Sequence, residues 1–328
     1  MGVMMHKFCL KLSCSFAVLT ALLSPAYAIP PITQTPIEMT SLPERPEVAQ
    51  NGILHLKFWL HVGLGNRLKK MISYLRVYHP RHLNLYWDKE DWVTSSFLDL
   101  FSPQWGITVT EFNDPYLIEN FAYPEPLWLY VNQNILLAAK DDFKDKQHRF
   151  IDTDYNDIPE EIIKIYKPWF ENLHPSSKVQ KRIDEVKLPQ NAVAVQVRNA
   201  PDWDLALNGN EPLEKFYKEM DKYPQDTIFY LSTMSKDVAL PFYRRYPNRI
   251  MELPDKDYSS MIDATADMFI LGRTKEAIFS FGSSFSEIGW WLGGAKTKVT
   301  IVGSRENWQE KRPIMKLEIL DRLPKAYR

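Results

Sequence analysis

An arginine at the end of an apolar run is the residue of this sequence with the clearest chemical potential. Arg198 follows the run 192–197, which is apolar except for Gln196 and predicts a buried strand of a parallel sheet. Parallel α/β sheets bind ligands beyond the carboxyl ends of their strands. The guanidinium fork bonds phosphate oxygens in pairs and can stabilise a departing diphosphate. Arg198 therefore predicts an anion site, and an ion pair with Asp202 or Asp204 is the alternative.

Two glycines earlier in the chain predict a second turn that could bind an anion. Gly63 and Gly65 follow the apolar run 53–60 and precede apolar residues at helical spacing. Such a turn brings unpaired N–H groups and the positive end of a helix close to a phosphate, and Asn66 and Arg67 would lie in its first helical turn. The third glycine of the dinucleotide-binding fingerprint is missing, so a plain strand–helix turn is the alternative.

A serine-rich turn after another apolar strand has similar chemistry. Gly282, Ser283, Ser284 and Phe285 follow a predicted strand and open a predicted helix, where hydroxyl and N–H groups suit an anion. Asp267, on the preceding predicted helix, could face the same ligand. A serine-hydrolase nucleophile elbow is the competing interpretation, but its second glycine is missing and no histidine is convincingly placed as its base.

The elements that must position these residues alternate between strands and helices. Strands are predicted at 53–60, 83–87, 107–110, 192–197, 227–232, 249–251, 277–281 and 299–302, and helices at 68–75, 132–142, 158–186, 213–223, 238–246, 259–272 and 284–292. This alternation predicts an α/β protein whose parallel sheets have helices on both faces. We expect two Rossmann-like lobes, an N-terminal one over 51–187 and a C-terminal one over 188–328, with the ligand site in the cleft between them.

The first 28 residues have the pattern of a secretory signal peptide. Lys7 and Lys11 precede an apolar run, 12–23, that is too short to span a bilayer, and the stretch 24–28 ends in a small-residue cleavage pattern. An uncleaved anchor is the alternative. Residues 29–50 are rich in proline and threonine without periodicity and predict a linker. We expect an exported protein without stable membrane insertion, periplasmic or secreted in a bacterium, or lumenal in the ER or Golgi of a eukaryote.

Composition excludes several classes of function. The 328 residues carry 40 basic and 41 acidic side chains, a net charge of −1, which argues against nucleic acid as an electrostatically driven partner. Cys9 and Cys14 both lie in the predicted leader, so the mature chain has neither a disulfide framework nor a cysteine-ligated metal site. A phosphate-bearing ligand would therefore be attracted by local groups and not by the overall charge.

The three motifs, in this order, resemble the GDP-fucose-dependent fucosyltransferases: the α1,6-fucosyltransferases, the nodulation fucosyltransferase and the protein O-fucosyltransferases. The matching segments are 63–67, Arg198 with Asn199 and the pair 202–203, and Asp267 followed by 283–286. The resemblance implies a GT-B-like fold. It also implies an inverting, metal-independent transfer of fucose from GDP-fucose to a glycan or protein hydroxyl, with no cofactor besides this nucleotide-sugar donor.

The resemblance also implies roles for single residues. Arg198 would hold the β-phosphate and stabilise the leaving GDP, Asp267 would recognise the guanine, and Ser283 and Ser284 the phosphates. Asn66 would contact the diphosphate side of the donor from the opposite lobe. Gly63, Gly65, Arg67, Gln196, Gly282 and Phe285 complete the expected donor site.

The sequence departs from the family pattern at two places and leaves the general base open. Gln196 stands where the family has histidine, and Thr233 is followed by Met234 where a Thr-Asp pair is common. Glutamine cannot carry a proton or a positive charge, so the donor pocket is altered or the protein is slow or inactive. Asp202, Asp204 and Glu211 are candidates for the base that deprotonates the acceptor, although each also suits a solvated loop.

Other functions remain open at this point. Asp152 and Asp154 resemble the paired carboxylates of metal-dependent transferases. The histidines between 55 and 82 have no metal-ligand spacing. A transferase using another nucleotide sugar is a further alternative. So is a secreted glycan-binding or host-interaction protein on a degenerate transferase scaffold, because an exported bacterial enzyme would be separated from cytosolic GDP-sugars.

Overall fold

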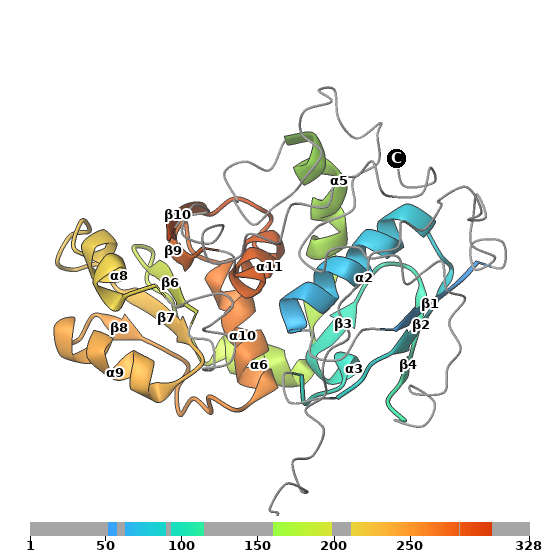
Figure 1. Ribbon diagram of the computed structural model, residues 1–328, viewed down its shortest axis with the longest axis horizontal. Helices are drawn as coiled ribbons and strands as arrows, with labels where there is room; N and C mark the ends of the chain where they lie inside the picture. The colour runs from blue at the N-terminus through green and yellow to red at the C-terminus, as the bar shows by residue number, and fades with distance from the viewer. Residues whose placement is uncertain are drawn as a thin grey trace, which may run out of the picture. The chain divides into compact units, whose positions relative to one another are not determined.

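The computed structural model describes residues 52–57, 63–89, 93–114, 160–198, 211–281 and 283–303 (Figure 1). The predicted signal peptide and linker, the predicted helix 132–142, the pair Asp152 and Asp154, and the predicted site residues Asp202, Asp204 and Gly282 lie outside these residues. The signal peptide, export and the lobe boundary at 187/188 therefore stay predictions. None of the described helices is both long and apolar enough to cross a membrane.

Five parallel strands form the larger sheet, in the C-terminal part of the chain. They are β6 (Val193–Val197), β7 (Phe229–Thr233), β8 (Ile250–Met251), β9 (Glu276–Ser280) and β10 (Lys298–Val302). Their spatial order is β10-β9-β6-β7-β8. The chain starts at the central strand β6, moves outward through β7 and β8, and returns to the other side of β6 for β9 and β10. The order reverses between β6 and β9, which makes that gap the topological switch point of a doubly wound sheet.

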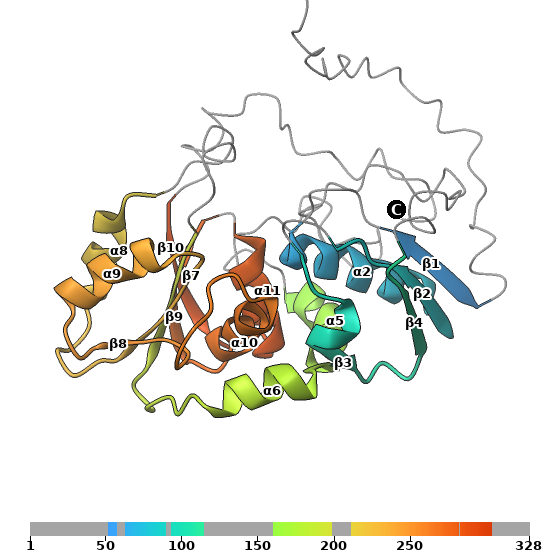
Figure 2. The ribbon, with the colours of Figure 1, turned by 90° about the horizontal axis from the view of Figure 1, so that it is seen from below.

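Helices cover both faces of this sheet (Figure 2). They are α8 (Leu213–Met220) and α9 (Lys236–Arg245) on one face, and α10 (Met261–Leu271) and α11 (Ser284–Leu292) on the other. Val193, Val195 and Val197 pack in the cluster with α8 and α9, whereas Ala194 packs in the cluster with α10 and α11. Because strand side chains alternate between faces, Gln196 lies on the α10–α11 face. Coverage on both sides explains why β6 is almost uninterruptedly apolar.

Three parallel strands form the smaller sheet, in the N-terminal part. They are β1 (Ile53–Lys57), β2 (His82–Tyr86) and β4 (Thr108–Phe112), paired in the order β1-β2-β4. The helix α2 (Leu64–Tyr78) follows β1 and shares its buried cluster with Leu54 and Leu56 of β1 and Leu83 and Leu85 of β2. Both sheets are parallel and both are followed by packed helices, so the predicted α/β architecture with two parallel sheets is confirmed.

The connection between the two sheets differs from the sequence prediction. Instead of one charged helix over 158–186, the chain forms α5 (Glu160–Glu171), the short strand β5 (Leu173–Pro175) and α6 (Ser177–Asp184). Ser176 ends the extended stretch and caps α6, because its Oγ accepts a hydrogen bond from the Val179 N–H. The strand β5 pairs with β3 (Phe101–Pro103), which follows the short helix α3 (Phe97–Leu100). Neither α3 nor β3 was predicted.

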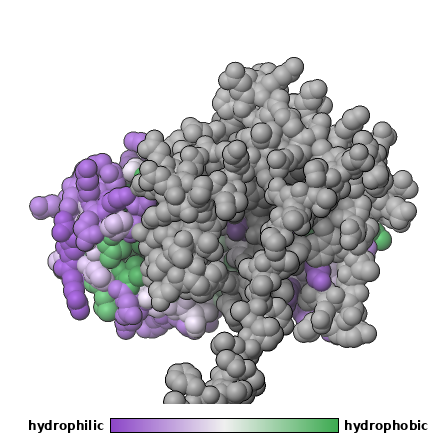
Figure 3. Space-filling view, viewed as in Figure 1, coloured by the Kyte–Doolittle hydropathy of each residue, from purple (hydrophilic) through white to green (hydrophobic). Residues whose placement is uncertain are grey.

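The two lobes share one hydrophobic core. A single buried cluster includes Leu68 and Tyr74 of α2, Phe170 of α5, and Ala266 of α10 together with Trp291 of α11. The rings of Phe170 and Trp291 are stacked with centroids 5.0 Å apart. On the face seen in Figure 3, the described surface of the C-terminal lobe is largely hydrophilic and carries one compact hydrophobic patch. The lobes are therefore joined by buried packing, and any cleft between them must lie beyond this contact.

Candidate active site

Arg198 leaves the larger sheet at its topological switch point. The ladder between β6 and β9 ends at the pair Gln196–Phe279. Beyond it, the Arg198 N–H donates a hydrogen bond to the Oγ of Ser280 at 2.7 Å, and the Ser280 hydroxyl donates to the Gln196 carbonyl at 3.2 Å. The predicted anion-binding residue thus stands at the edge where doubly wound sheets bind their ligands, beside the strand that leads to the serine-rich turn.

The serine-rich turn delivers the N-terminus of α11 to the same edge. Ser283 is the N-cap residue, buried and in extended conformation, and its side chain does not cap the helix. Its carbonyl accepts a hydrogen bond from the Ser286 hydroxyl at 3.1 Å. Ser284 begins the helix and is half-buried, as is Phe285, which packs against the core. The first turn of a helix has N–H groups without partners inside the helix, and together with the helix dipole this favours an anion.

The N-terminus of α2 packs against this turn, and Gly65 makes that contact possible. A Cβ atom on Gly65 would lie 2.7 Å from the backbone C and O of Ser284 and 2.8 Å from its Oγ. In this structure the group that approaches Gly65 is the backbone of α11, and the predicted contact of Gly65 with a phosphate stays a prediction. Gly63 differs, since a Cβ there would meet no atom of the described residues within 4 Å.

A buried ion pair joins the same two helices one turn further on. Lys69 Nζ and Glu287 Oε2 are 2.6 Å apart, and both side chains have no exposed surface. Glu287 Oε1 also accepts a hydrogen bond from Trp291 Nε1 at 3.3 Å. Removal of two charges from water is costly unless the pair and its hydrogen bonds are nearly ideal, so this contact fixes the relative position of α2 and α11 tightly.

Arg67 has a structural position that sequence reasoning did not foresee. Its side chain is fully buried, its guanidinium lies 4.9 Å from the ring centroid of Trp87, and its Nη1 donates a hydrogen bond to the Asp88 carbonyl. It therefore holds the chain that follows β2. No surface of the side chain is exposed in this structure, so the predicted contact between Arg67 and the donor stays a prediction.

Two buried acceptors at this edge have no donor among the described residues. They are the Oδ1 of Asn66, in the first turn of α2, and the Oε1 of Gln196, near the end of β6. Gln196 is only 4% exposed. A buried acceptor without a partner is rare and costs free energy until a donor arrives. A phosphate offers only acceptor oxygens at neutral pH, so these two atoms would suit hydroxyl or N–H groups of a ligand.

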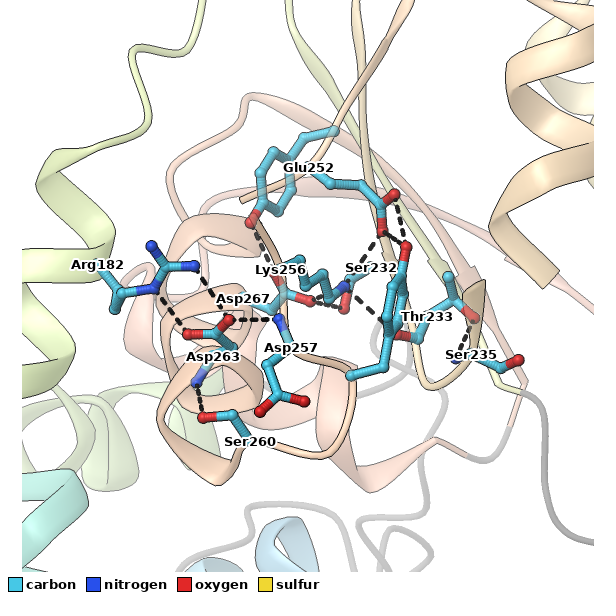
Figure 4. Close-up of polar contacts among 12 residues, drawn as sticks. Arg182, Ser232, Thr233, Ser235, Glu252, Lys256, Asp257, Ser260, Asp263 and Asp267 are labelled. Atoms are coloured by element: carbon cyan, nitrogen blue, oxygen red, sulfur yellow. Dashed lines mark hydrogen bonds and ion pairs between the residues drawn. The ribbon is translucent and has the colours of Figure 1, made fainter. Parts of the chain in front are cut away.

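The carboxylate of Asp267 is engaged within the lobe (Figure 4). It accepts hydrogen bonds from the Tyr230 hydroxyl at 2.6 Å, the Ser232 hydroxyl at 2.9 Å and Lys256 Nζ at 2.7 Å. Burial and the Asp267 charge together raise the pKa of Tyr230 well above its usual value. The side chain of Asp267 is 2% exposed. The prediction that Asp267 faces the ligand and recognises guanine is untested and stays a prediction.

Lys256 is a residue of this edge that the sequence did not reveal. Besides Asp267, its Nζ contacts the carbonyl of Thr233, the last residue of β7, and Oε1 of Glu252, each at 3.3 Å. Glu252 in turn accepts hydrogen bonds from Tyr243 and Tyr258. Glu252 lies four residues before Lys256, but Thr233 and Asp267 are 23 and 11 residues away, so the sequence did not bring these groups together.

The remaining candidate base within the described residues, Glu211, lies beside the end of β10. It pairs with Lys215 on α8 and its carboxylate lies against Gly303, the residue after β10. Because β9 separates β10 from β6, Glu211 stands at the same edge but not beside Arg198. Its role as a base stays a prediction, as do those of Asp202 and Asp204.

A cavity of about 460 Å³ opens at the opposite end of the larger sheet. Its lining includes Ala192 at the start of β6 and Thr274 and Lys275 just before β9, and none of the predicted site residues. The amino ends of parallel strands are not where doubly wound sheets bind their ligands. We therefore place the candidate active site at the carboxyl edge, despite this cavity.

Comparison with known proteins returned only distant structural likenesses. No protein-family model and no curated protein matches the sequence. The fucosyltransferase NodZ from Bradyrhizobium is 18% identical, with 72% of this chain and 91% of that chain covered and a TM-score of 0.43. POFUT1 in complex with GDP-fucose is 13% identical, with 78% and 98% covered and a TM-score of 0.45. Arabidopsis thaliana FUT1 in complex with GDP is 15% identical, with 78% and 71% covered and a TM-score of 0.45.

These three proteins are fucosyltransferases, the class that the sequence motifs resemble. Likenesses at this identity and TM-score do not transfer an activity. The function proposed below therefore rests on the residues of this chain and their positions.

Proposed function

We propose that this protein is a glycosyltransferase that transfers fucose from GDP-fucose to a hydroxyl group of a glycan or protein. The observation that carries the proposal is the position of Arg198 at the β6–β9 switch point, fixed by Ser280 and beside the N-terminus of α11. A cationic fork and a helix N-terminus at one point suit a diphosphate. The order of the sequence motifs, which resembles that of GDP-fucose enzymes, supports GDP as the nucleotide.

In the proposed reaction, the acceptor oxygen attacks C1 of fucose from the face opposite the diphosphate. The bond between C1 and the diphosphate oxygen breaks, and its electron pair leaves with GDP. Charge develops on that oxygen in the transition state, so donors fixed in advance lower the barrier most. Arg198 and the N–H groups at the start of α11 would supply this stabilisation, and the mechanism we propose needs no metal ion.

The acceptor hydroxyl loses its proton to a base during attack. Asp202, Asp204 and Glu211 are the candidates, and of these only Glu211 lies among the described residues, where it pairs with Lys215. Gln196 cannot take a proton, but its unpaired Oε1 could accept a hydrogen bond from a donor hydroxyl or N–H group. We propose that Gln196 binds the nucleotide sugar and takes no part in proton transfer.

We further propose that the protein acts outside the cytosol, because of its N-terminal leader pattern. In a eukaryotic lumen an exported transferase would meet its donor. In a bacterium it would be separated from cytosolic GDP-sugars, and there a glycan-binding protein on the same scaffold is the second candidate. The glutamine at position 196, in place of the family's histidine, favours this second candidate.

Calorimetry of the purified mature protein with GDP, UDP and GDP-fucose tests the proposal. We expect GDP and GDP-fucose to bind and UDP to bind more weakly. Arg198→Ala should lower turnover of GDP-fucose by about 100- to 1,000-fold, the usual loss when one preorganised transition-state donor is removed. Arg273→Ala is the matched control, because Arg273 is exposed beside β9 at the amino edge of the same sheet.

Two results would overturn the proposal. Absence of GDP binding at millimolar concentration would exclude the enzyme and leave the glycan-binding candidate, which glycan-array binding would then test. Full turnover by Arg198→Ala would remove Arg198 from its role and with it the observation on which the proposal depends.

A further inference from the structure

The way β6 and β9 part at the carboxyl edge points to a residue that sequence reasoning passed over. Their ladder pairs four residues of each strand and stops at Gln196 and Phe279. At the next residue of β9, the side-chain hydroxyl of Ser280 makes the hydrogen bonds to β6 that a backbone group would make in a continuing ladder. Its Oγ accepts from the Arg198 N–H at 2.7 Å and its hydroxyl donates to the Gln196 carbonyl at 3.2 Å. A hydroxyl can serve both groups because it is donor and acceptor at once.

The Ser280 hydroxyl connects β9 to the last hydrogen-bonded groups of β6 before the chain leaves the sheet. Ser280 is 4% exposed, so little water competes for its hydroxyl. The two groups that it holds flank Val197 and belong to the residues whose side chains we assign to the donor, Gln196 and Arg198. Ser280 therefore fixes the backbone on either side of Val197, and with it the direction in which the side chains of Gln196 and Arg198 leave β6.

We propose that Ser280 is a positioning residue for Arg198 in donor activation. The inference rests on the proposed function. With alanine at position 280, the Arg198 N–H and the Gln196 carbonyl would lose their partner at a buried place, and the backbone would relax to find another. Reactions that depend on a preorganised charge are sensitive to displacements of about 1 Å, which can cost roughly 100-fold in rate.

The kinetic signature of positioning differs from that of a general loss of stability. Ser280→Ala should lower kcat for GDP-fucose by about 10- to 100-fold while KM for the donor changes much less, because the bound donor keeps its other contacts. Ser280→Thr keeps the hydroxyl and should restore most of kcat. If Ser280→Ala fails to fold, Ser280→Cys offers a weaker hydrogen-bonding group of similar size, and its kcat should lie between those of wild type and alanine.

A double-mutant cycle separates positioning from structure. In the Arg198→Ala background, Ser280→Ala should have little further effect on kcat, because the residue that it positions is already gone. Thr297→Val is the matched control. Thr297 is also buried, and its hydroxyl bridges to the Thr274 carbonyl at 2.8 Å, at the amino edge of the same sheet. It should lower thermal stability without the selective loss of kcat.

The outcomes distinguish this inference from the proposed function. If Ser280→Ala lowers kcat by the same factor in the wild-type and the Arg198→Ala backgrounds, the positioning role is overturned. A wild-type kcat in Ser280→Ala would overturn it as well. If the wild-type protein neither binds GDP nor turns over GDP-fucose, the proposed function fails by itself. Amide hydrogen exchange then still tests whether Ser280 holds the Arg198 N–H. Faster exchange at this N–H in Ser280→Ala than in Thr297→Val supports the contact, and unchanged exchange overturns it.

Discussion

At the scale of single residues, two glycines of one motif have different reasons to be glycine. Gly65 is held against the backbone of Ser284, where any Cβ would overlap it. Gly63 has open space at its Cβ position and a backbone φ of −63°, which any residue adopts. Packing within the chain therefore accounts for Gly65 but not for Gly63. Among the described residues nothing requires a glycine at position 63, and a ligand that approaches the start of α2 is the reason we propose.

Alanine at each glycine separates these two reasons. Gly65→Ala should destabilise the protein by about 1–3 kcal/mol, the usual cost of inserting a methyl group where neighbours cannot move. Gly63→Ala should leave stability within about 0.5 kcal/mol, as for a surface substitution, but should raise KM for GDP-fucose if the donor passes close to it. Urea unfolding and donor kinetics measure the two effects. A stable Gly65→Ala would mean that the two helix starts are not in contact in solution.

At the scale of elements, sequence patterns predicted the regular pieces well. The strands of the larger sheet fall within a few residues of their predicted places, because continuous apolar runs identify strands buried on both faces. The sequence predicts the charged segment 158–186 as one helical stretch. The structure breaks it at β5, where Ser176 caps the next helix. The hydrogen bond of the Ser176 side chain at the start of α6 decides where the helix breaks. This break can be recognised only once β3, the strand that pairs with β5, is known.

The site was less predictable than the strands and helices, because its residues come from segments that lie far apart in the sequence. Arg198 and the serine-rich turn could be found because strand ends meet at one edge of a parallel sheet. The partners of Lys256 could not, since Thr233, Glu252 and Asp267 reach it from a strand end, a loop and a helix. Sequence also could not tell whether the group approaching Gly65 is a ligand or a second helix. The burial of Arg67 could not be foreseen for the same reason, because its contact with the Trp87 ring depends on the strand that follows α2.

The contact between α2 and α11 leads to a prediction at the same scale. Glu287→Gln would leave Lys69 as a buried charge without its carboxylate, and we expect a loss of about 3–5 kcal/mol in the free energy of unfolding. Replacing both residues together, as Lys69→Met with Glu287→Leu, should recover much of that loss, because no buried charge remains. Urea unfolding monitored by circular dichroism gives these values.

An exposed ion pair provides the control for this experiment. Lys178 Nζ and Asp99 Oδ1 are 2.7 Å apart, but their side chains are 63% and 44% exposed. Lys178→Met should therefore change stability by less than about 1 kcal/mol. If Glu287→Gln proves as mild as Lys178→Met, water must reach the Lys69–Glu287 pair in solution, and α2 and α11 would not be tightly joined.

At the scale of the whole molecule, the shared core decides how the two lobes respond to stress. Proteins built from two α/β lobes often unfold in separate steps, one for each hydrophobic core. Here a single buried cluster contains side chains from both sheets, and Trp291 of the C-terminal lobe stacks on Phe170 from the connection. The buried Lys69–Glu287 pair crosses the same contact. Separation of the lobes would expose apolar surface and two charges at once.

We therefore expect the two lobes to unfold together in one transition. Far-ultraviolet circular dichroism, which follows both sheets, and tryptophan fluorescence should give coincident urea curves. A fragment of residues 188–328 should not fold cooperatively alone, because Trp291 would lose Tyr166 and Phe170 of α5 and Glu287 would lose Lys69 of α2. GDP, which we place at the edge where α2 meets α11, should shift the single transition upward without splitting it. Two separate transitions, or a cooperatively folded fragment, would show that the lobes fold independently. A site built from the N-termini of α2 and α11 would then need another contact to hold these two helices together.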